Sequence, residues 1–147
     1  MVTIAASSRL LASQLPSRNG YGCPCSVSLL IIRKDLETFD WNGTEGPVGK
    51  SYDVLGDGSL VMVNIPGHSE GLCALKIKNA EGKYVLLFAD GGYATKSWRE
   101  MITSGITLDK KMQRQSLQWI REQSMSPDCI ASLATHDTDV QPHVIEL

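Results

Sequence analysis

Short apolar segments alternate with tight-turn sequences through the middle of this chain, and their spacing restricts the possible folds more than any other feature. Four segments have the length and composition of strands: 51–55 (SYDVL), 60–65 (LVMVNI), 72–78 (LCALKIK) and 84–89 (YVLLFA). The residues between them include the turn sequences GDGS and NAEGK, which hold the glycine, aspartate and asparagine that hairpins use. The pattern therefore predicts a meander of strands.

The segment 84–89 is apolar at every position, so we expect both faces of this strand to be covered. A short helix is predicted over 95–103, and the best helical pattern lies over 107–123. Its apolar stripe consists of Leu108, Met112, Leu117, Trp119 and Ile120. A turn and an apolar strand are predicted over 127–135, and a last strand over 143–147. Strands followed by helices and further strands indicate an α+β fold, with helices covering a sheet face.

The first 50 residues give a weaker pattern, because prolines and glycines interrupt the first 25. We predict a strand over 26–33, a short helix over 33–41 and a loop over 42–49. The total length of 147 residues fits one domain with a sizeable core.

Charge and hydropathy exclude several classes of partner. The chain has 14 Lys and Arg against 16 Asp and Glu, a net charge of −2, so it lacks the basic surface of a nucleic-acid-binding protein. No apolar run approaches the roughly 20 residues that a membrane-spanning helix needs. Its four cysteines are too few for a disulfide scaffold, and Cys73 and Cys129 lie in apolar runs where we expect them to be buried. A reducing compartment, the cytoplasm, is the expected location.

Three residues of metal-binding type follow predicted strands. His68 lies in the loop after 60–65, Asp90 comes directly after 84–89, and His136 follows 127–135. Because strands of one sheet end at common edges, these side chains can converge, and imidazole with carboxylate suits zinc, iron or manganese. Each residue also has an ordinary interpretation, as a turn residue, a loop acid or a helix cap. The spacing alone leaves both interpretations open.

Three longer blocks resemble a known family. GDGSLVMVNIPGHSEGLCALKI, LLFADGGY and PDCIASLATHD together resemble the second half of a metallo-β-lactamase-fold hydrolase, and most of all its N-acyl homoserine lactone lactonase branch. The resemblance extends over roughly residues 49–147. It implies an incomplete αββα-type metallo-β-lactamase fold, with 26–147 as a partial domain and 1–25 as a segment that matches nothing recognised.

The resemblance also implies roles for four residues. His68 matches the histidine that binds the first metal, Asp90 the aspartate that bridges two metals, and His136 the histidine that binds the second. The implied metal is Zn²⁺, and the implied substrate is a small-molecule lactone, opened by a metal-bound hydroxide. Asp90 would pass a proton to the leaving alkoxide, and Tyr93 would hydrogen-bond the lactone. Without the resemblance, Tyr93 would be interpreted as an ordinary loop aromatic residue.

The family's defining motif, HxHxDH, is absent, because no histidine precedes His68. A catalytic zinc takes about three protein ligands, and this chain keeps one terminal ligand for each metal and the bridge. We therefore expect a truncated hydrolase that is weak or inactive alone. The alternatives are a non-catalytic remnant or interaction module, half of a split enzyme completed by an N-terminal half that carries HxHxDH, and a glyoxalase II-like thioesterase. An exposed apolar sheet face would also favour self-association.

Overall fold

The computed structural model describes residues 3–6 and 39–147. The predicted strand over 26–33 and most of the predicted helix over 33–41 lie outside the described residues, as does the predicted domain boundary after residue 25. Thr3–Ala6 and Trp41–Leu147 belong to one compact unit, which contains all described strands and helices.

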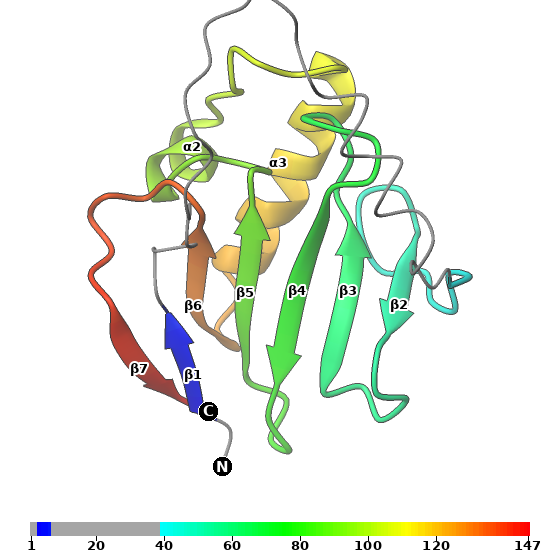
Figure 1. Ribbon diagram of the computed structural model, residues 1–147, viewed down its shortest axis with the longest axis vertical. Coiled ribbons are helices and arrows are strands. Elements are labelled where there is room, and N and C mark those ends of the chain that lie inside the picture. The colour runs from blue at the N-terminus through cyan, green and yellow to red at the C-terminus, as the bar shows by residue number, and fades with distance from the viewer. Residues whose placement is uncertain (1–2, 7–38) are drawn as a thin grey trace, which may run out of the picture. The chain divides into compact units, whose positions relative to one another are not determined.

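A five-stranded sheet forms the centre of this unit, in the order β2-β3-β4-β5-β6 (Figure 1). Its strands are β2 (Ser51–Asp53), β3 (Leu60–Asn64), β4 (Cys73–Lys78), β5 (Tyr84–Ala89) and β6 (Cys129–Ala134). The first four strands are antiparallel neighbours, which confirms the predicted meander, and β6 runs parallel to β5. The parallel pairing is possible because two helices intervene between β5 and β6.

A second sheet pairs β1 (Thr3–Ala6) with β7 (His143–Glu146) in antiparallel register. The strand predicted over 143–147 is therefore confirmed. The strand β1 was not predicted, because its four residues have no turn signal to mark their ends.

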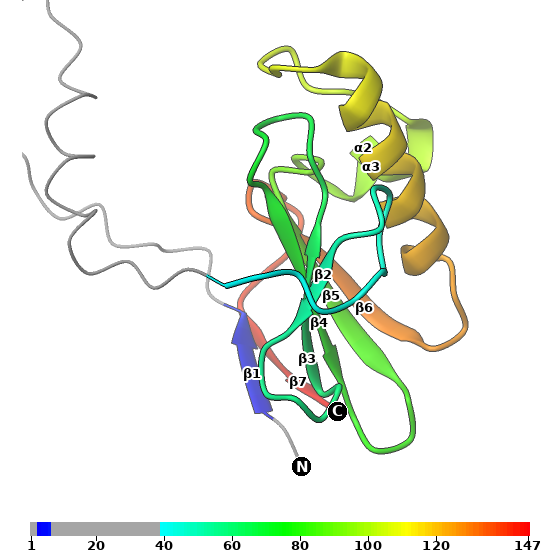
Figure 2. The ribbon, with the colours of Figure 1, turned by 90° about the vertical axis from the view of Figure 1, so that its right-hand side faces the viewer.

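Two helices lie on one face of the five-stranded sheet (Figure 2). The helix α2 (Thr95–Glu100) is shorter than predicted, because Met101 adopts a left-handed conformation with φ 56° and ends it. The helix α3 (Lys110–Ser124) begins three residues later than predicted, because the Asp109 carboxylate accepts hydrogen bonds from the Lys111 and Met112 amides as an N-cap. Leu108 consequently lies outside the helix and is 77% exposed, so its predicted place in the apolar stripe is wrong.

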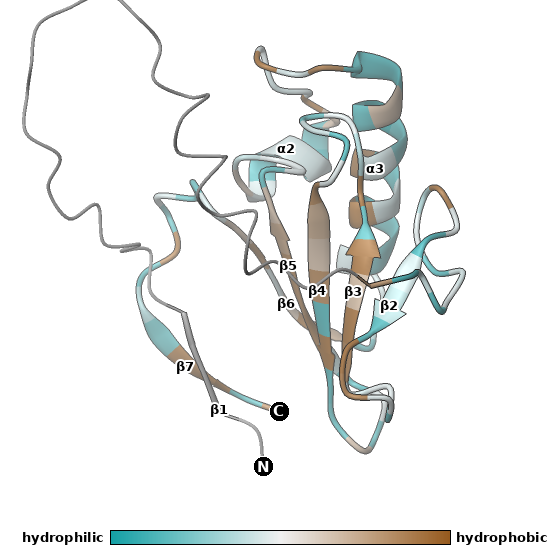
Figure 3. Ribbon diagram, turned by 45° about the vertical axis from the view of Figure 1, so that its right-hand side comes forward, coloured by the Kyte–Doolittle hydropathy of each residue, from teal (hydrophilic) through white to brown (hydrophobic). Residues whose placement is uncertain are grey.

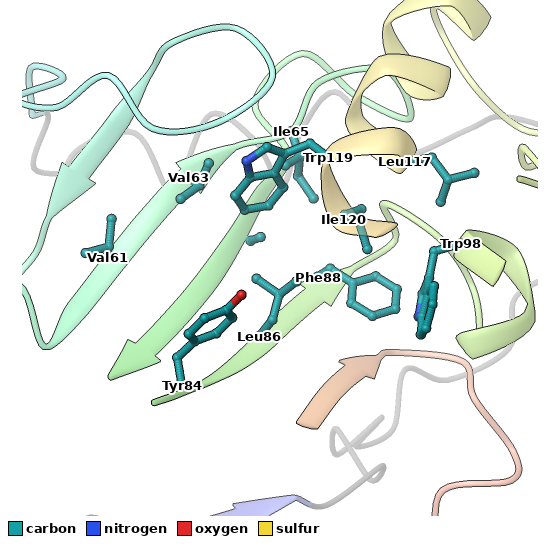
Figure 4. Close-up of a cluster of buried hydrophobic side chains, with 11 residues drawn as sticks. Val61, Val63, Ile65, Tyr84, Leu86, Phe88, Trp98, Leu117, Trp119 and Ile120 are labelled. Atoms are coloured by element: carbon teal, nitrogen blue, oxygen red, sulfur yellow. The ribbon is translucent and has the colours of Figure 1, made fainter. Parts of the chain in front are cut away.

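The hydrophobic core lies between the sheet and α3 (Figure 4). It contains the following buried side chains: Val61, Val63, Ile65, Ala74, Tyr84, Leu86, Phe88, Trp98, Leu117, Trp119 and Ile120. Figure 3 shows that hydrophobic residues predominate in β3, β4 and β5. The predicted cover of β5 is confirmed at four of its positions, while Leu87 and Ala89 are half-buried.

Two details of the predicted core differ from the structure. Gln113 and Ser116 are fully buried on the face of α3 that also buries Leu117, although both are polar. Cys73 and Cys129 are half-buried rather than buried, and partial burial raises the pKa of both thiols. Among the described residues, no helix combines the length and the apolar character needed to cross a membrane.

Candidate functional site

The three predicted ligands lie together, each in the loop that follows a strand: His68 after β3, Asp90 after β5 and His136 after β6. Asp90 is the central residue. Its Oδ2 atom is 3.9 Å from Nε2 of His68, and its Oδ1 atom is 3.1 Å from Nε2 of His136. The structure thus brings together three side chains from positions 22 and 46 residues apart in the sequence (90 − 68 and 136 − 90).

Tyr93 completes this group. Its ring centroid is 6.1 Å from that of His68 and 5.2 Å from that of His136, and both histidine rings meet it edge to face. Tyr93 therefore lies beside both imidazoles. The remaining histidine, His143, is exposed on β7, and its Nδ1 atom is 2.7 Å from the carbonyl oxygen of Gln141.

The His68 loop is held from two sides. On one side the Asn64 amide donates hydrogen bonds to the carbonyls of Glu70 (3.1 Å) and Leu72 (3.2 Å). On the other side the Ser116 hydroxyl, from α3, donates to the Pro66 carbonyl at 2.6 Å. These bonds fix the backbone on both flanks of the histidine.

Gly67 lets this loop approach α3 closely. Its φ of 139° is strained for other residues, and a Cβ atom at this position would lie 2.3 Å from the backbone of Gln113. The Gly67 carbonyl accepts hydrogen bonds from the Thr107 hydroxyl (2.7 Å) and from the amides of Leu108 and Asp109 (3.0 Å each). The loop that carries His68 is therefore built onto the segment just before α3.

The His136 loop is fastened by its neighbour Asp137, which is only 8% exposed. Oδ2 of Asp137 accepts hydrogen bonds from the amide and the hydroxyl of Thr95, each at 2.7 Å. Thr95 is the first residue of α2, and the preceding Ala94 has no side-chain acceptor, so Asp137 takes the place of an N-cap. These hydrogen bonds lower the pKa of Asp137. They tie His136 to a helix that begins two residues after Tyr93.

Whether these side chains can hold a metal depends on their number and on their free acceptors. Oδ1 of Asp90 is buried and has no assigned hydrogen bond, although Nε2 of His136 lies 3.1 Å away. A bare carboxylate oxygen beside imidazoles is of the donor type that zinc binds. Across residues 3–6 and 39–147, however, no group of three or more His, Cys, Asp or Glu side chains is arranged to hold a metal ion. The donor types fit zinc, but the set is incomplete.

The sequence pattern did not reveal the side chains that hold these loops, which are Asn64, Ser116 and Asp137. One signal was present: Gln113 and Ser116 fall at helical spacing with Leu117 and Ile120, so two polar residues share the apolar face of α3. Buried polar residues of this kind need hydrogen-bond partners. Ser116 finds its partner in the Pro66 carbonyl, and Gln113 finds its partner in the Ser104 hydroxyl.

Known proteins similar in sequence cover part of this chain. The N-acyl homoserine lactonase AttM of Rhizobium radiobacter is 32% identical over 111 residues, and that of Agrobacterium fabrum is 31% identical over 111 residues. Each match covers 74% of this chain and 41% of the relative, so the chain spans about two fifths of these relatives' length. No protein-family model matches the chain.

Solved structures similar in fold belong to the same class of protein. An N-acyl homoserine lactone hydrolase with the product N-hexanoyl-L-homoserine bound at its catalytic metal centre matches with a TM-score of 0.51 at 23% identity. A B. thuringiensis AiiA variant with N-decanoyl-L-homoserine bound matches with the same score and identity. Each comparison covers 65% of this chain and 35% of the other. The likeness shows the fold: the mixed sheet and its helices have the arrangement found in metallo-β-lactamase-fold lactonases.

Proposed function

We propose that this chain, a partial-length relative of the metallo-β-lactamase-fold N-acyl homoserine lactonases, supplies one side of a two-zinc site for lactone hydrolysis. The observation that carries the proposal is the convergence of His68 and His136 on the two oxygens of Asp90. Three loops from separate strands would have no structural need to bring these donor types together.

In this proposal His68, His136 and Asp90 would be the residues of this chain that hold the zinc ions. Two-metal hydrolases use their metals to activate water and to polarise the carbonyl under attack. Tyr93, whose ring meets both imidazoles, would donate a hydrogen bond from its phenol to the lactone carbonyl as charge develops on its oxygen. Asp90 would carry a proton to the alkoxide that leaves when the ring opens.

The chain has three histidines and none before His68, so it holds one terminal ligand for each metal. Because a catalytic zinc takes about three protein ligands, we propose that the chain alone hydrolyses lactones weakly or not at all. A second chain that carries HxHxDH would supply the remaining ligands.

The apolar character of the sheet supports such a partner. Core residues such as Val61 and Leu86 face α3, and side chains alternate across a strand, so their neighbours face the opposite side of the sheet. Those neighbours are apolar as well: Leu60, Met62, Leu75, Ile77 and Leu87 are half-buried, and Val85 is already fully buried. A sheet that is apolar on both faces suits the inside of a layered fold. We propose that this second face packs against the completing chain, and self-association is the competing outcome.

A non-catalytic role is the second candidate. It is favoured by the absence, among the described residues, of any three-donor group arranged to hold a metal. In that case the preserved loops would serve as an interaction module.

Zinc content and lactone hydrolysis, measured together, test the proposal. The purified chain alone should hold little zinc by mass spectrometry and should leave N-hexanoyl-L-homoserine lactone intact. Mixing it with an N-terminal fragment of a lactonase chosen because it carries HxHxDH should restore zinc binding and hydrolysis. The Asp90→Ala variant should lose both in the mixture, whereas Asp128→Ala, which changes an exposed acid just before β6, should keep them.

Two outcomes would contradict the proposal. Two zinc ions per chain with rapid turnover by the chain alone would refute the half-site. A mixture with a well-folded complex but no zinc and no turnover would favour the non-catalytic module.

A further inference from the structure

We propose that a hydrogen-bonded relay from α3 fixes the tautomer of His68, and that its members Ser104 and Gln113 are positioning residues. The relay runs from the Gln113 side chain through the Ser104 hydroxyl to the carbonyl of Ile106, which contacts the imidazole. Its residues lie in the first turn of α3 and in the loop before it.

The direction of each hydrogen bond follows from the groups involved. Nε2 of Gln113 is an amide nitrogen and donates to Oγ of Ser104 at 2.7 Å. Because that bond uses Ser104 as an acceptor, its single hydroxyl proton is free to go to the Ile106 carbonyl, also at 2.7 Å. The same carbonyl oxygen lies 2.8 Å from Nδ1 of His68. A carbonyl can only accept, so Nδ1 must carry the proton.

The tautomer determines what His68 presents to Asp90. With the proton on Nδ1, a neutral imidazole has its lone pair on Nε2, the atom that lies 3.9 Å from Oδ2 of Asp90. Nε2 and the carboxylate are then both acceptors, so no hydrogen bond can form between them and a cation can bind both. The use of this lone pair by zinc rests on the proposed function, whereas the tautomer itself rests only on the relay.

The relay is held firmly at the α3 end. Gln113 is 1% exposed, and the backbone of Gly67 packs against it. Its buried Oε1 atom has no hydrogen bond within the described part of the chain. The bond to Ser104 is therefore the one that orients this amide.

Nitrogen-15 long-range NMR on the metal-free chain measures the tautomer directly, at a pH where the imidazoles are neutral. A His68→Gln variant assigns the His68 signals among the three histidines. We expect the wild-type chain to carry the proton on Nδ1. In Ser104→Ala the ratio of the two tautomers should move by about two- to tenfold toward protonated Nε2, because the Ile106 carbonyl is no longer held in place to accept from Nδ1. Ser104→Thr keeps the hydroxyl and should restore the wild-type ratio.

Thr107→Val is the matched control, because it removes a hydrogen bond from the same loop but to the Gly67 carbonyl. It should leave the tautomer unchanged. A wild-type His68 protonated on Nε2 would overturn the proposal, and so would equal shifts in Thr107→Val and Ser104→Ala. Gln113→Leu should match Ser104→Ala, and if that variant does not fold, the Ser104 variants still decide the question. The samples contain no metal and no lactone, so failure of the proposed hydrolysis would not alter this result.

Discussion

The bond between Asp137 and Thr95 is predicted to be the main fastening of the His136 loop, and the Asp137→Ala variant tests it. Asp137 is 8% exposed and accepts two hydrogen bonds of 2.7 Å from Thr95, one from the amide and one from the hydroxyl. Alanine removes the Oδ2 atom that accepts both bonds and leaves the first amide of α2 without its capping partner.

The size of the effect follows from these contacts. Loss of a helix-capping acceptor costs about 1 kcal/mol, and a hydrogen bond to a charged group contributes about 1.5–3 kcal/mol. We therefore expect Asp137→Ala to lower the free energy of unfolding by about 2–3 kcal/mol at pH 7. With a urea dependence of about 1.5 kcal/mol per molar, the midpoint of unfolding should fall by about 1.3–2 M. Asp137→Asn keeps an oxygen acceptor without the charge and should lose about half as much.

The effect should depend on pH in a defined direction. The hydrogen bonds from Thr95 lower the pKa of Asp137 in the folded chain. Its stabilisation is therefore complete above the unfolded-state pKa of about 3.9 and is lost as the pH falls through the lower folded-state pKa. Urea unfolding measured at pH 7 and at successively lower pH should show the difference between wild type and Asp137→Ala shrinking below about pH 4.

Asp139→Ala serves as the control, because this exposed acid is close by and only its backbone amide bonds to Asp137. It should change stability by less than about 0.5 kcal/mol. A loss for Asp137→Ala no larger than that of Asp139→Ala, or a loss that is unchanged at low pH, would refute the role of this carboxylate as the cap of α2.

The same structure predicts the outcome of two other substitutions. Gly67→Ala should destabilise the chain by more than about 3 kcal/mol in thermal or urea unfolding, because the new Cβ would meet the Gln113 backbone and the φ of Gly67 is 139°. Gly71→Ala is its control and should be nearly neutral, because the space around Gly71 is open. Leu117→Ala removes a fully buried side chain and should cost about 2–5 kcal/mol, whereas Leu108→Ala should cost less than about 0.5 kcal/mol because Leu108 is 77% exposed. Equal losses within either pair would contradict the burial described above.

The central sheet could be predicted from the sequence because its signals are local. Turn residues mark the ends of β3, β4 and β5, and apolar content identifies β5 as covered. The ends of strands and helices that are set by side-chain hydrogen bonds could not be predicted from the local sequence. The strand β2 ends at Asp53, two residues early, because its carboxylate accepts hydrogen bonds from the amides of Gly56 and Gly58 and so begins the turn. Val54 and Leu55 are consequently exposed, although their composition is typical of a strand.

The convergence of the site could also be predicted, because strand ends lie at common edges and His68, Asp90 and His136 each follow a strand. The residues that hold their loops could not be predicted, because their partners lie far away in the sequence. Asp137 and Thr95 are 42 residues apart, and Ser116 and Pro66 are 50 apart. No local pattern connects residues at such separations. Only the packing of the helices against the sheet brings them within hydrogen-bond distance.

The hydrogen bonds that position the site lie entirely within this chain. Asn64 and Ser116 fix the His68 loop, and Asp137 fixes the His136 loop, each through a bond to another residue of this chain. In the proposed two-chain site, a completing chain would therefore need to bring ligands but not to reorganise these loops. It follows that Asp137→Ala should weaken zinc binding in the reconstituted mixture even where the two chains still associate.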